Sequence, residues 1–182
     1  MPGHGGSLPP SPWVQRFGSP LAPGCQVLDV ACGAGRHVRW FAQRGCRVTA
    51  LDRDAAALEP LRAIAEVQVA DLEQGPWPLP GRRFDAVVVT HYLWRALWPA
   101  LLESIAPRGW LLYETFAAGQ ESVGRPSNPD FLLRPGELLD VARGSLRVVA
   151  YEDGFLAAPD RFIQRIAAVR EAPSAQPASY PL

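Results

Sequence analysis

The chain has 182 residues, with 18 basic and 18 acidic side chains. This length suits one domain with a sizeable core. The balanced charge argues against a broad nucleic-acid-binding surface, which needs a basic excess. No apolar run reaches membrane-spanning length, and Met1 to Pro12 lacks the apolar core of a secretory signal. We therefore expect a cytoplasmic protein with neither a nucleic-acid nor a membrane partner.

Cysteine and histidine usage predicts neither a disulfide framework nor a bound metal. The cysteine count is odd, no C-x-x-C pair occurs, and the histidines are too scattered for a metal site. The positions are Cys25, Cys32 and Cys46 for cysteine and His4, His37 and His91 for histidine.

At the start of the chain, residues 1–10 are expected to be disordered, and a short helix is predicted from Ser11 to Phe17. Ser11 suits the N-cap and Pro12 the first helical position. Trp13 and Phe17 are four residues apart. They could fold over a ligand pocket as a lid, or pack against the domain surface.

The central stretch, Val27 to Gln43, predicts a buried parallel strand, a glycine turn and a helix. Gly33 and Gly35 allow the backbone to turn sharply and to approach a ligand closely. The helix from Arg36 directs unpaired N–H groups and its positive dipole end toward the space above the strand. An anionic group is expected there.

Two further predicted strands, Cys46 to Leu51 and Val67 to Ala70, run into acidic residues, with a helix from Asp54 to Ala63 between them. In a parallel sheet, Asp52 lies above the same crevice as the glycine turn. It follows that turn by about 20 residues, the spacing at which an acidic side chain binds ribose hydroxyls. Asp71 occupies the matching place on the next strand.

The second half of the chain continues the alternation of strands and helices. Residues 116–130 lack a regular period, and a long loop at the end of a strand is usually functional. Residues 171–182 are rich in Pro, Ser and Ala and predict a flexible tail. The predicted elements are strands Phe84–Thr90, Trp110–Thr115, Leu146–Tyr151 and Arg161–Val169 and helices Leu93–Ile105 and one opening at Pro135.

The segment Asp29-x-Ala31-x-Gly33-x-Gly35 resembles the first motif of class I S-adenosylmethionine-dependent methyltransferases, acid-x-Gly-x-Gly-x-Gly, with alanine at the first glycine. Val38 stands where a dinucleotide fold would have its third glycine. The resemblance covers residues 24–170. More narrowly, the chain is similar to the small tellurite-resistance group, in Leu28-Asp29-x-Ala31-Cys32-Gly33-x-Gly35-Arg36, Gly136-Glu137-Leu138-Leu139 and Tyr151-Glu152-Asp153.

This resemblance implies an α/β fold: a single-domain, Rossmann-like, mostly parallel sheet of seven strands in the order 3-2-1-4-5-7-6. Strand 7 would be antiparallel, with helices on both faces, and the domain would span residues 11–170. It implies S-adenosylmethionine as the cofactor and S-adenosylhomocysteine as its product.

By the same resemblance, Asp52 would bind the ribose, and Asp71 and Leu72 the adenine. Arg36 would pair with the donor carboxylate or be a surface residue. The expected cofactor-binding residues are Asp29, Ala31, Gly33, Gly35, Arg36, Asp52, Arg53, Asp71, Leu72 and Thr90.

His91 is the candidate general base, because histidine titrates near neutral pH; alternatively it only shapes the pocket. Tyr92 is a second catalytic candidate. Arg95 and Glu114 could instead form a structural ion pair. The candidate acceptor-binding residues are Trp94, Arg95, Tyr113, Glu114, Phe116 and Arg125.

The sequence thus predicts methyl transfer to a small molecule, such as a thiol, another soft nucleophile or a chalcogen oxyanion. Two alternatives stay open. One is a non-catalytic module that binds S-adenosylmethionine or a nucleotide. The other is an NAD(P)-dependent oxidoreductase, which Val38 and the lack of a Tyr-x-x-x-Lys pair disfavour.

Overall fold

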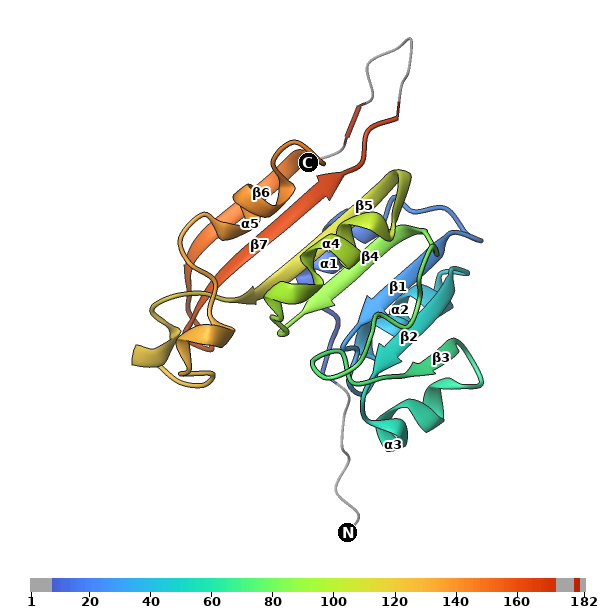
Figure 1. The fold of residues 1–182 in the computed structure, drawn as a ribbon, viewed down its shortest axis with the longest axis horizontal. Coiled ribbons are helices and arrows are strands. Elements are labelled where there is room, and N and C mark those ends of the chain that lie inside the picture. Colours follow the sequence, from blue (N-terminus) through green and yellow to red (C-terminus); the bar gives the residue numbers. More distant parts are fainter. Residues whose placement is uncertain (1–7, 173–178, 181–182) are drawn as a thin grey trace.

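A computed structural model of the chain describes residues 8–172 and 179–180. Within these residues the strands form one sheet in the order β3-β2-β1-β4-β5-β7-β6 (Figure 1). Neighbours pair in parallel except β7, which is antiparallel to β5 and β6. This confirms the predicted topology. The strands are β1 Gln26–Val30, β2 Arg47–Asp52, β3 Glu66–Val69, β4 Phe84–Thr90, β5 Ile105–Phe116, β6 Arg147–Leu156 and β7 Arg161–Val169.

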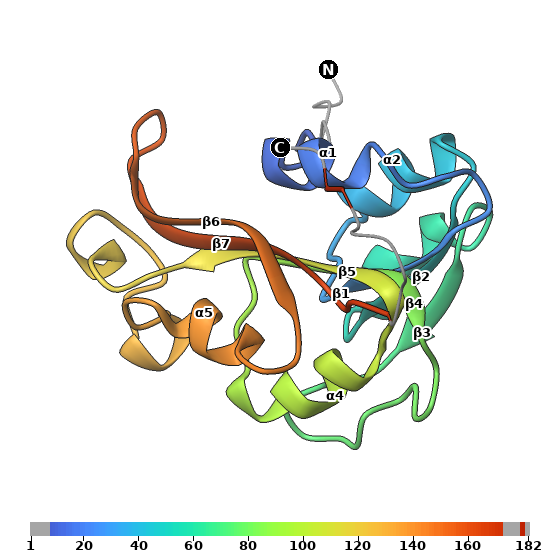
Figure 2. The same ribbon diagram turned by 90° about the horizontal axis from the view of Figure 1, so that it is seen from above.

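Helices cover both faces of the sheet, with α1 and α2 on one side and α4 and α5 on the other (Figure 2). Short 3-10 turns at residues 59–61, 95–97, 120–122 and 129–131 complete the connections. None of the helices in the described ranges is long and apolar enough to cross a membrane. The helices are α1 Pro12–Gly18, α2 Arg36–Gln43, α3 Ala55–Leu58, α4 Trp98–Glu103 and α5 Glu137–Ala142.

The central strands are buried on both faces, so their side chains alternate between two apolar layers. On β4, Val87 and Val89 pack in the layer under α4 and α5. Ala86 and Val88 pack in the layer under α1 and α2. This alternation fixes which side chains at the strand ends share a face.

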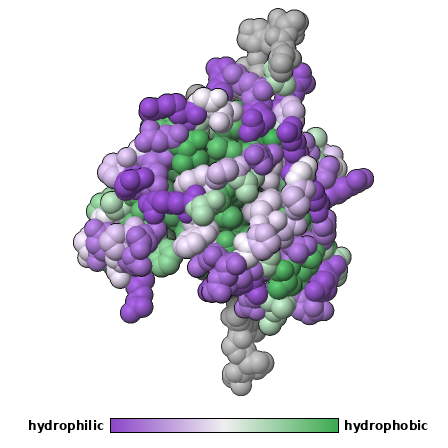
Figure 3. Space-filling view, viewed as in Figure 1, coloured by the Kyte–Doolittle hydropathy of each residue, from purple (hydrophilic) through white to green (hydrophobic). Residues whose placement is uncertain are grey.

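The two helices α4 and α5 are only six residues long and leave a hollow between them, lined by Trp98, Leu102 and Val141 among others. In the space-filling view, apolar side chains reach the surface near the middle of this face and are surrounded by polar ones (Figure 3). The apolar layer is therefore incompletely covered here.

Helix α1 packs against the sheet, which decides between the two roles considered for Trp13 and Phe17. Their side chains are only 2% and 1% exposed. The Trp13 indole N–H donates to the carbonyl of Ile166 at 3.1 Å. The Phe17 ring lies 6.1 Å from that of Trp110. Both rings belong to the core, so α1 is not a lid.

Two predicted helices were too long. The helix expected over residues 54–63 ends at Leu58 and continues as a 3-10 turn. Pro60 lacks the N–H that an α-helix requires and clashes with the preceding turn. The helix expected over residues 93–105 becomes a 3-10 turn followed by α4, with Pro99 in the first turn of α4. Ile105 already belongs to β5.

Two strands in the second half extend beyond their predicted bounds. Strand β5 begins five residues earlier than expected, across a register shift between Phe84 and Ala86. Strand β6 continues past Tyr151 to Leu156, because its outer residues pair in register with β7. Of residues 1–10, predicted to be disordered, residues 1–7 lie outside the described residues. Of the predicted tail, 171–182, residues 173–178 and 181–182 also lie outside them.

We predict that Ser11→Ala lowers the unfolding free energy by about 1–2 kcal/mol, measured by urea denaturation. The Ser11 hydroxyl caps α1 by accepting from the N–H groups of Trp13 and Val14, and donates to Glu114 at 3.0 Å. The control is Ser19→Ala, because Ser19 at the other end of α1 is exposed. Equal effects of the two substitutions would contradict the prediction.

Candidate functional site

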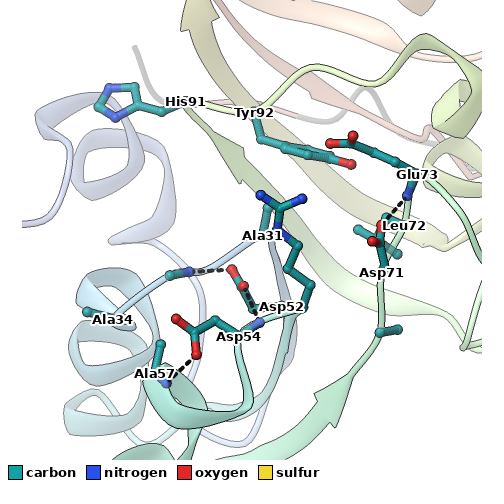
Figure 4. Close-up of a pocket in the computed structure, with 13 residues that line it drawn as sticks. Ala31, Ala34, Asp52, Asp54, Ala57, Asp71, Leu72, Glu73, His91 and Tyr92 are labelled. Atoms are coloured by element: carbon teal, nitrogen blue, oxygen red, sulfur yellow. Dashed lines mark hydrogen bonds between the residues drawn. The ribbon is translucent and has the colours of Figure 1, made fainter.

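A cavity of about 490 Å³ lies at the carboxyl ends of β1 to β4 (Figure 4). Within the described chain, every residue that lines it falls between positions 31 and 92. The lining residues are Ala31, Gly33, Ala34, Asp52, Arg53, Asp54, Ala57, Ala70, Asp71, Leu72, Glu73, His91 and Tyr92. One half of the chain therefore builds this cavity.

The turn after β1 runs through the left-handed backbone region. Ala31, Gly33 and Gly35 have φ values of 52°, 53° and 77°. A Cβ at Gly35 would lie 2.5 Å from Leu61 Cδ1, whereas one at Gly33 would meet no atom within 4 Å. Gly35 therefore allows the turn to pack on the core, while Gly33 leaves open space for a ligand. Ala31 adopts a conformation that glycine would adopt with less strain.

Asp52 joins the end of β2 to the glycine turn. One carboxylate oxygen accepts the N–H of Gly33 at 2.8 Å, and the other accepts the N–H of Asp54 at 2.9 Å. Asp71 lies on the opposite side of the cavity and accepts the N–H of Glu73 at 2.9 Å (Figure 4). These bonds fix the two carboxylates and leave them lone pairs for a ligand.

Asp54 is the N-cap of α3, as its sequence position suggests. Its carboxylate accepts from the N–H groups of Ala56 and Ala57. Although Asp54 lines the cavity, its side chain is thus engaged by the helix. Ala34, Ala57, Ala70 and Glu73 also line the cavity and were missed from the sequence. Only their closeness in sequence to Gly33, Asp54 and Asp71 could have indicated them.

Asp29 is fully buried and does not line the cavity. Among the described residues, neither of its carboxylate oxygens has a hydrogen-bond partner. Burial raises the pKa of Asp29 to about 7. The nearest basic atom is Nδ1 of His37, at 3.9 Å. Burial lowers the pKa of His37 to about 3, so the imidazole is neutral and does not form an ion pair with Asp29.

Arg36, at the start of α2, is partly buried and does not line the cavity. Its Nη2 donates to Thr90 Oγ1 and its Nη1 to the carbonyl of Pro9, both at 3.4 Å. Burial lowers the pKa of Arg36. Thr90 likewise lies outside the lining, at the end of β4. Arg36 is therefore neither a fully exposed surface residue nor part of an ion pair within the described chain.

His91 lies at the rim of the cavity in a left-handed backbone conformation, with φ 55°. Its N–H donates to the carbonyl of Glu114 at 2.9 Å, and its ring stacks on Phe116 with centroids 5.1 Å apart. In Figure 4 the imidazole points away from Asp52 and Asp71. Burial, and next the charge of Arg36, lower its pKa. His91 is therefore neutral at neutral pH.

The Tyr92 ring lies over the cavity beside Glu73 (Figure 4). Burial and the negative charge of Glu73 raise the pKa of the Tyr92 phenol. The phenol is therefore a hydrogen-bond donor at neutral pH and cannot act as a base there. The backbone carbonyl of Tyr92 accepts from the hydroxyl of Tyr113 at 2.6 Å, which links the segment after β4 to β5.

The predicted ion pair between Arg95 and Glu114 is wrong, because each residue has another partner. Arg95 binds both carboxylate oxygens of Glu137, at 2.7 and 2.9 Å. Glu114 accepts from Ser11 at 3.0 Å and from Arg165 at 3.3 Å. These pairs link segments 42 to 103 residues apart, which the sequence alone does not indicate.

None of the six predicted acceptor-binding residues lines the cavity. Trp94 packs against the apolar layer under α4, and Tyr113 is buried against Trp98. Arg125 is exposed in the connection after β5. Phe116 reaches the site through its stacking on His91. Of the ten predicted cofactor-binding residues, six line the cavity and four do not. The six are Ala31, Gly33, Asp52, Arg53, Asp71 and Leu72, and the four are Asp29, Gly35, Arg36 and Thr90.

Comparisons with known proteins agree with this arrangement. Residues 27–107 match the family described as "Methyltransferase domain". A segment of 106 residues is 37% identical to malonyl-[acyl-carrier protein] O-methyltransferase of Serratia marcescens. The match covers 53% of this chain and 40% of that protein, so the chain spans less than half of this curated relative.

Two solved structures share the fold. TehB from Haemophilus influenzae has a TM-score of 0.66 at 19% identity, over 81% of this chain and 58% of TehB. An S-adenosylmethionine-dependent methyltransferase from Mesorhizobium loti has a TM-score of 0.66 at 20% identity, over 83% and 93% of the two chains. Together with the strand order, these matches show that the chain has the fold of the class I S-adenosylmethionine-dependent methyltransferases.

Proposed function

We propose that this protein transfers a methyl group from S-adenosylmethionine to a small-molecule acceptor. The observation that supports this most directly is the cavity at the ends of β1, β2 and β3. There a glycine turn with open space at Gly33 faces two fixed carboxylates, Asp52 and Asp71. A nucleoside offers the hydroxyl and amino donors that two such acceptors need.

The residues present fit this donor. Asp52 can accept the ribose hydroxyls with its remaining lone pairs, and Asp71 and Leu72 can hold the adenine. The methionine part is assigned to the turn, where the buried carboxyl of Asp29 lacks a hydrogen-bond partner within the described chain. Arg36 has no acidic partner there and can pair with the donor carboxylate.

When bound, S-adenosylmethionine supplies an activated methyl group on a sulfonium. The chain itself then has to hold donor and acceptor in line, and such positioning can supply roughly 7–11 kcal/mol of the barrier. The glycine turn after β1, Asp52 and the side chains at the end of β4 provide this positioning. A general base is needed only for an acceptor that carries a proton at the working pH.

For His91 we propose a wall of the acceptor site rather than the general base. Its imidazole stacks on Phe116, and although the residue is exposed, partial desolvation and the charge of Arg36 lower its pKa, which makes it a weaker base than free histidine. The nature of the acceptor atom is a further proposal. A thiol, another soft nucleophile or a chalcogen oxyanion would suit the family, and the similar Serratia protein is named an O-methyltransferase.

Asp52→Ala should weaken S-adenosylmethionine binding about 10- to 100-fold in calorimetry, because charge-assisted hydrogen bonds contribute about 1.5–3 kcal/mol each. Asp140→Ala is the control, since Asp140 is exposed on α5 and pairs with Arg143. Unchanged affinity in a folded Asp52→Ala protein would remove Asp52 from the donor site. A protein that binds the donor but forms no S-adenosylhomocysteine with a broad acceptor panel would be a binding module.

His91→Ala should keep kcat within about threefold and raise the acceptor KM, as expected for a pocket wall. The measurement is steady-state formation of S-adenosylhomocysteine with an acceptor found in the panel. A fall in kcat of about 100-fold or more would identify His91 as the general base instead.

Relative to the wild type, Asp29→Asn should raise the unfolding free energy more at pH 8 than at pH 5. The pKa of Asp29 is raised from 3.8 to about 7 in the folded state, so its favourable contribution is complete below pH 3.8. It is lost as the pH rises to 7, at a cost on the order of 2–4 kcal/mol. Urea denaturation of both proteins at the two pH values measures this. A difference that does not change with pH would show that the carboxylate is not destabilised by burial.

A further inference from the structure

A group of polar and aromatic side chains lies beside His91, outside the cavity lining. The register pairs Thr90 with Glu114, and Glu114 with Arg165, across β4, β5 and β7. Paired residues share a face of the sheet, here the one that carries α1 and α2. Phe116 and Arg161 follow on the same face by alternation, because Phe116 pairs with Ile163, two residues after Arg161.

The acidic groups near this surface already have partners. Glu114 accepts from the Ser11 hydroxyl at 3.0 Å and from Arg165 at 3.3 Å. Arg165 also pairs with Glu152 on β6. The charges of Arg165 and Glu114 are thus compensated within the fold.

Arg36 and Arg161 form no direct pair of this kind, although the charge of Glu114 acts favourably on Arg36. Within the described residues neither forms an ion pair, and Arg36 makes only the two 3.4 Å contacts with Thr90 and Pro9. Each side chain is partly buried. The charge of Arg161 reaches both Arg36 and His91: burial is the main cause of their lowered pKa, Glu114 raises it, and Arg161 contributes to lowering it. Two like charges in a partly desolvated place repel each other unless an anion lies between them.

The stacked rings of His91 and Phe116 add a flat apolar surface beside these cations. His91 also borders the cavity proposed for the donor. A small molecule seated here would therefore have its body against the two rings, its charged end toward the guanidinium groups and its reacting atom near the end of β4.

We propose that this surface binds the carboxylate of a small anionic acceptor, with Arg161 as the residue that recognises the negative charge. The proposal rests on the proposed methyl transfer. A guanidinium matches the two oxygens of a carboxylate geometrically, which favours this anion over a halide. Arg36, nearer the glycine turn, remains available to the donor carboxylate.

The test uses the full chain saturated with S-adenosylhomocysteine, so that any site for the donor carboxylate is filled. Calorimetry then compares benzoate with benzamide and acetate with acetamide, at constant ionic strength. Each carboxylate should bind at least about tenfold more tightly than its amide. Arg161→Gln should remove about tenfold of the benzoate affinity, and Arg161→Lys should restore part of it, while S-adenosylhomocysteine affinity stays within about twofold.

The control is Arg83→Gln, because Arg83 is exposed just before the amino end of β4, whereas His91 follows the carboxyl end of that strand. It should leave both affinities unchanged. Equal binding of acids and amides, or equal loss of benzoate affinity in Arg83→Gln and Arg161→Gln, would overturn the proposal. If wild-type protein failed to bind S-adenosylhomocysteine at all, the proposed function itself would fail, which distinguishes the two cases.

Discussion

The contact between Gly35 and Leu61 is the constraint on which the cavity depends. The backbone of the turn lies so close to Leu61 that a Cβ at position 35 would be 2.5 Å from its side chain. This close packing places the turn beside the end of β2, where the Gly33 N–H donates to the Asp52 carboxylate at 2.8 Å. A buried leucine thus helps to place a carboxylate that it does not touch. The cavity is preorganised by core packing.

The fold could be predicted from the sequence to the extent that its signals are local. Short apolar runs in the sequence predicted β1, β2 and β4. The acidic residues at the end of β2 and shortly after β3 indicated that the carboxyl ends of these strands face one site. The strand order and the antiparallel β7 came from the family resemblance. Helix lengths were less predictable, because Pro60 and Pro99 interrupt patterns that are apolar at helical spacing.

The partners of charged residues could not be predicted. Arg95 pairs with Glu137, 42 residues away, and Glu114 bonds to Ser11, 103 residues away. Such contacts depend on how the strands and loops are finally packed, and no spacing in the sequence encodes them. The sequence did predict that Asp29 lies in a buried strand. Its motif position suggested a ligand contact, whereas α1 and α2 enclose this part of β1 in the core.

Among the described residues, those that line the cavity come from positions 31–92, whereas Phe116 and Arg161 belong to β5 and β7. Under the proposed function, residues 31–92 hold the methyl donor, and residues of β5 and β7 join His91 around the acceptor. Substitutions along β5 and β7 could then change which compounds are accepted while binding of the donor is retained. Such an architecture is suited to diversification by small numbers of exchanges far from its glycine turn.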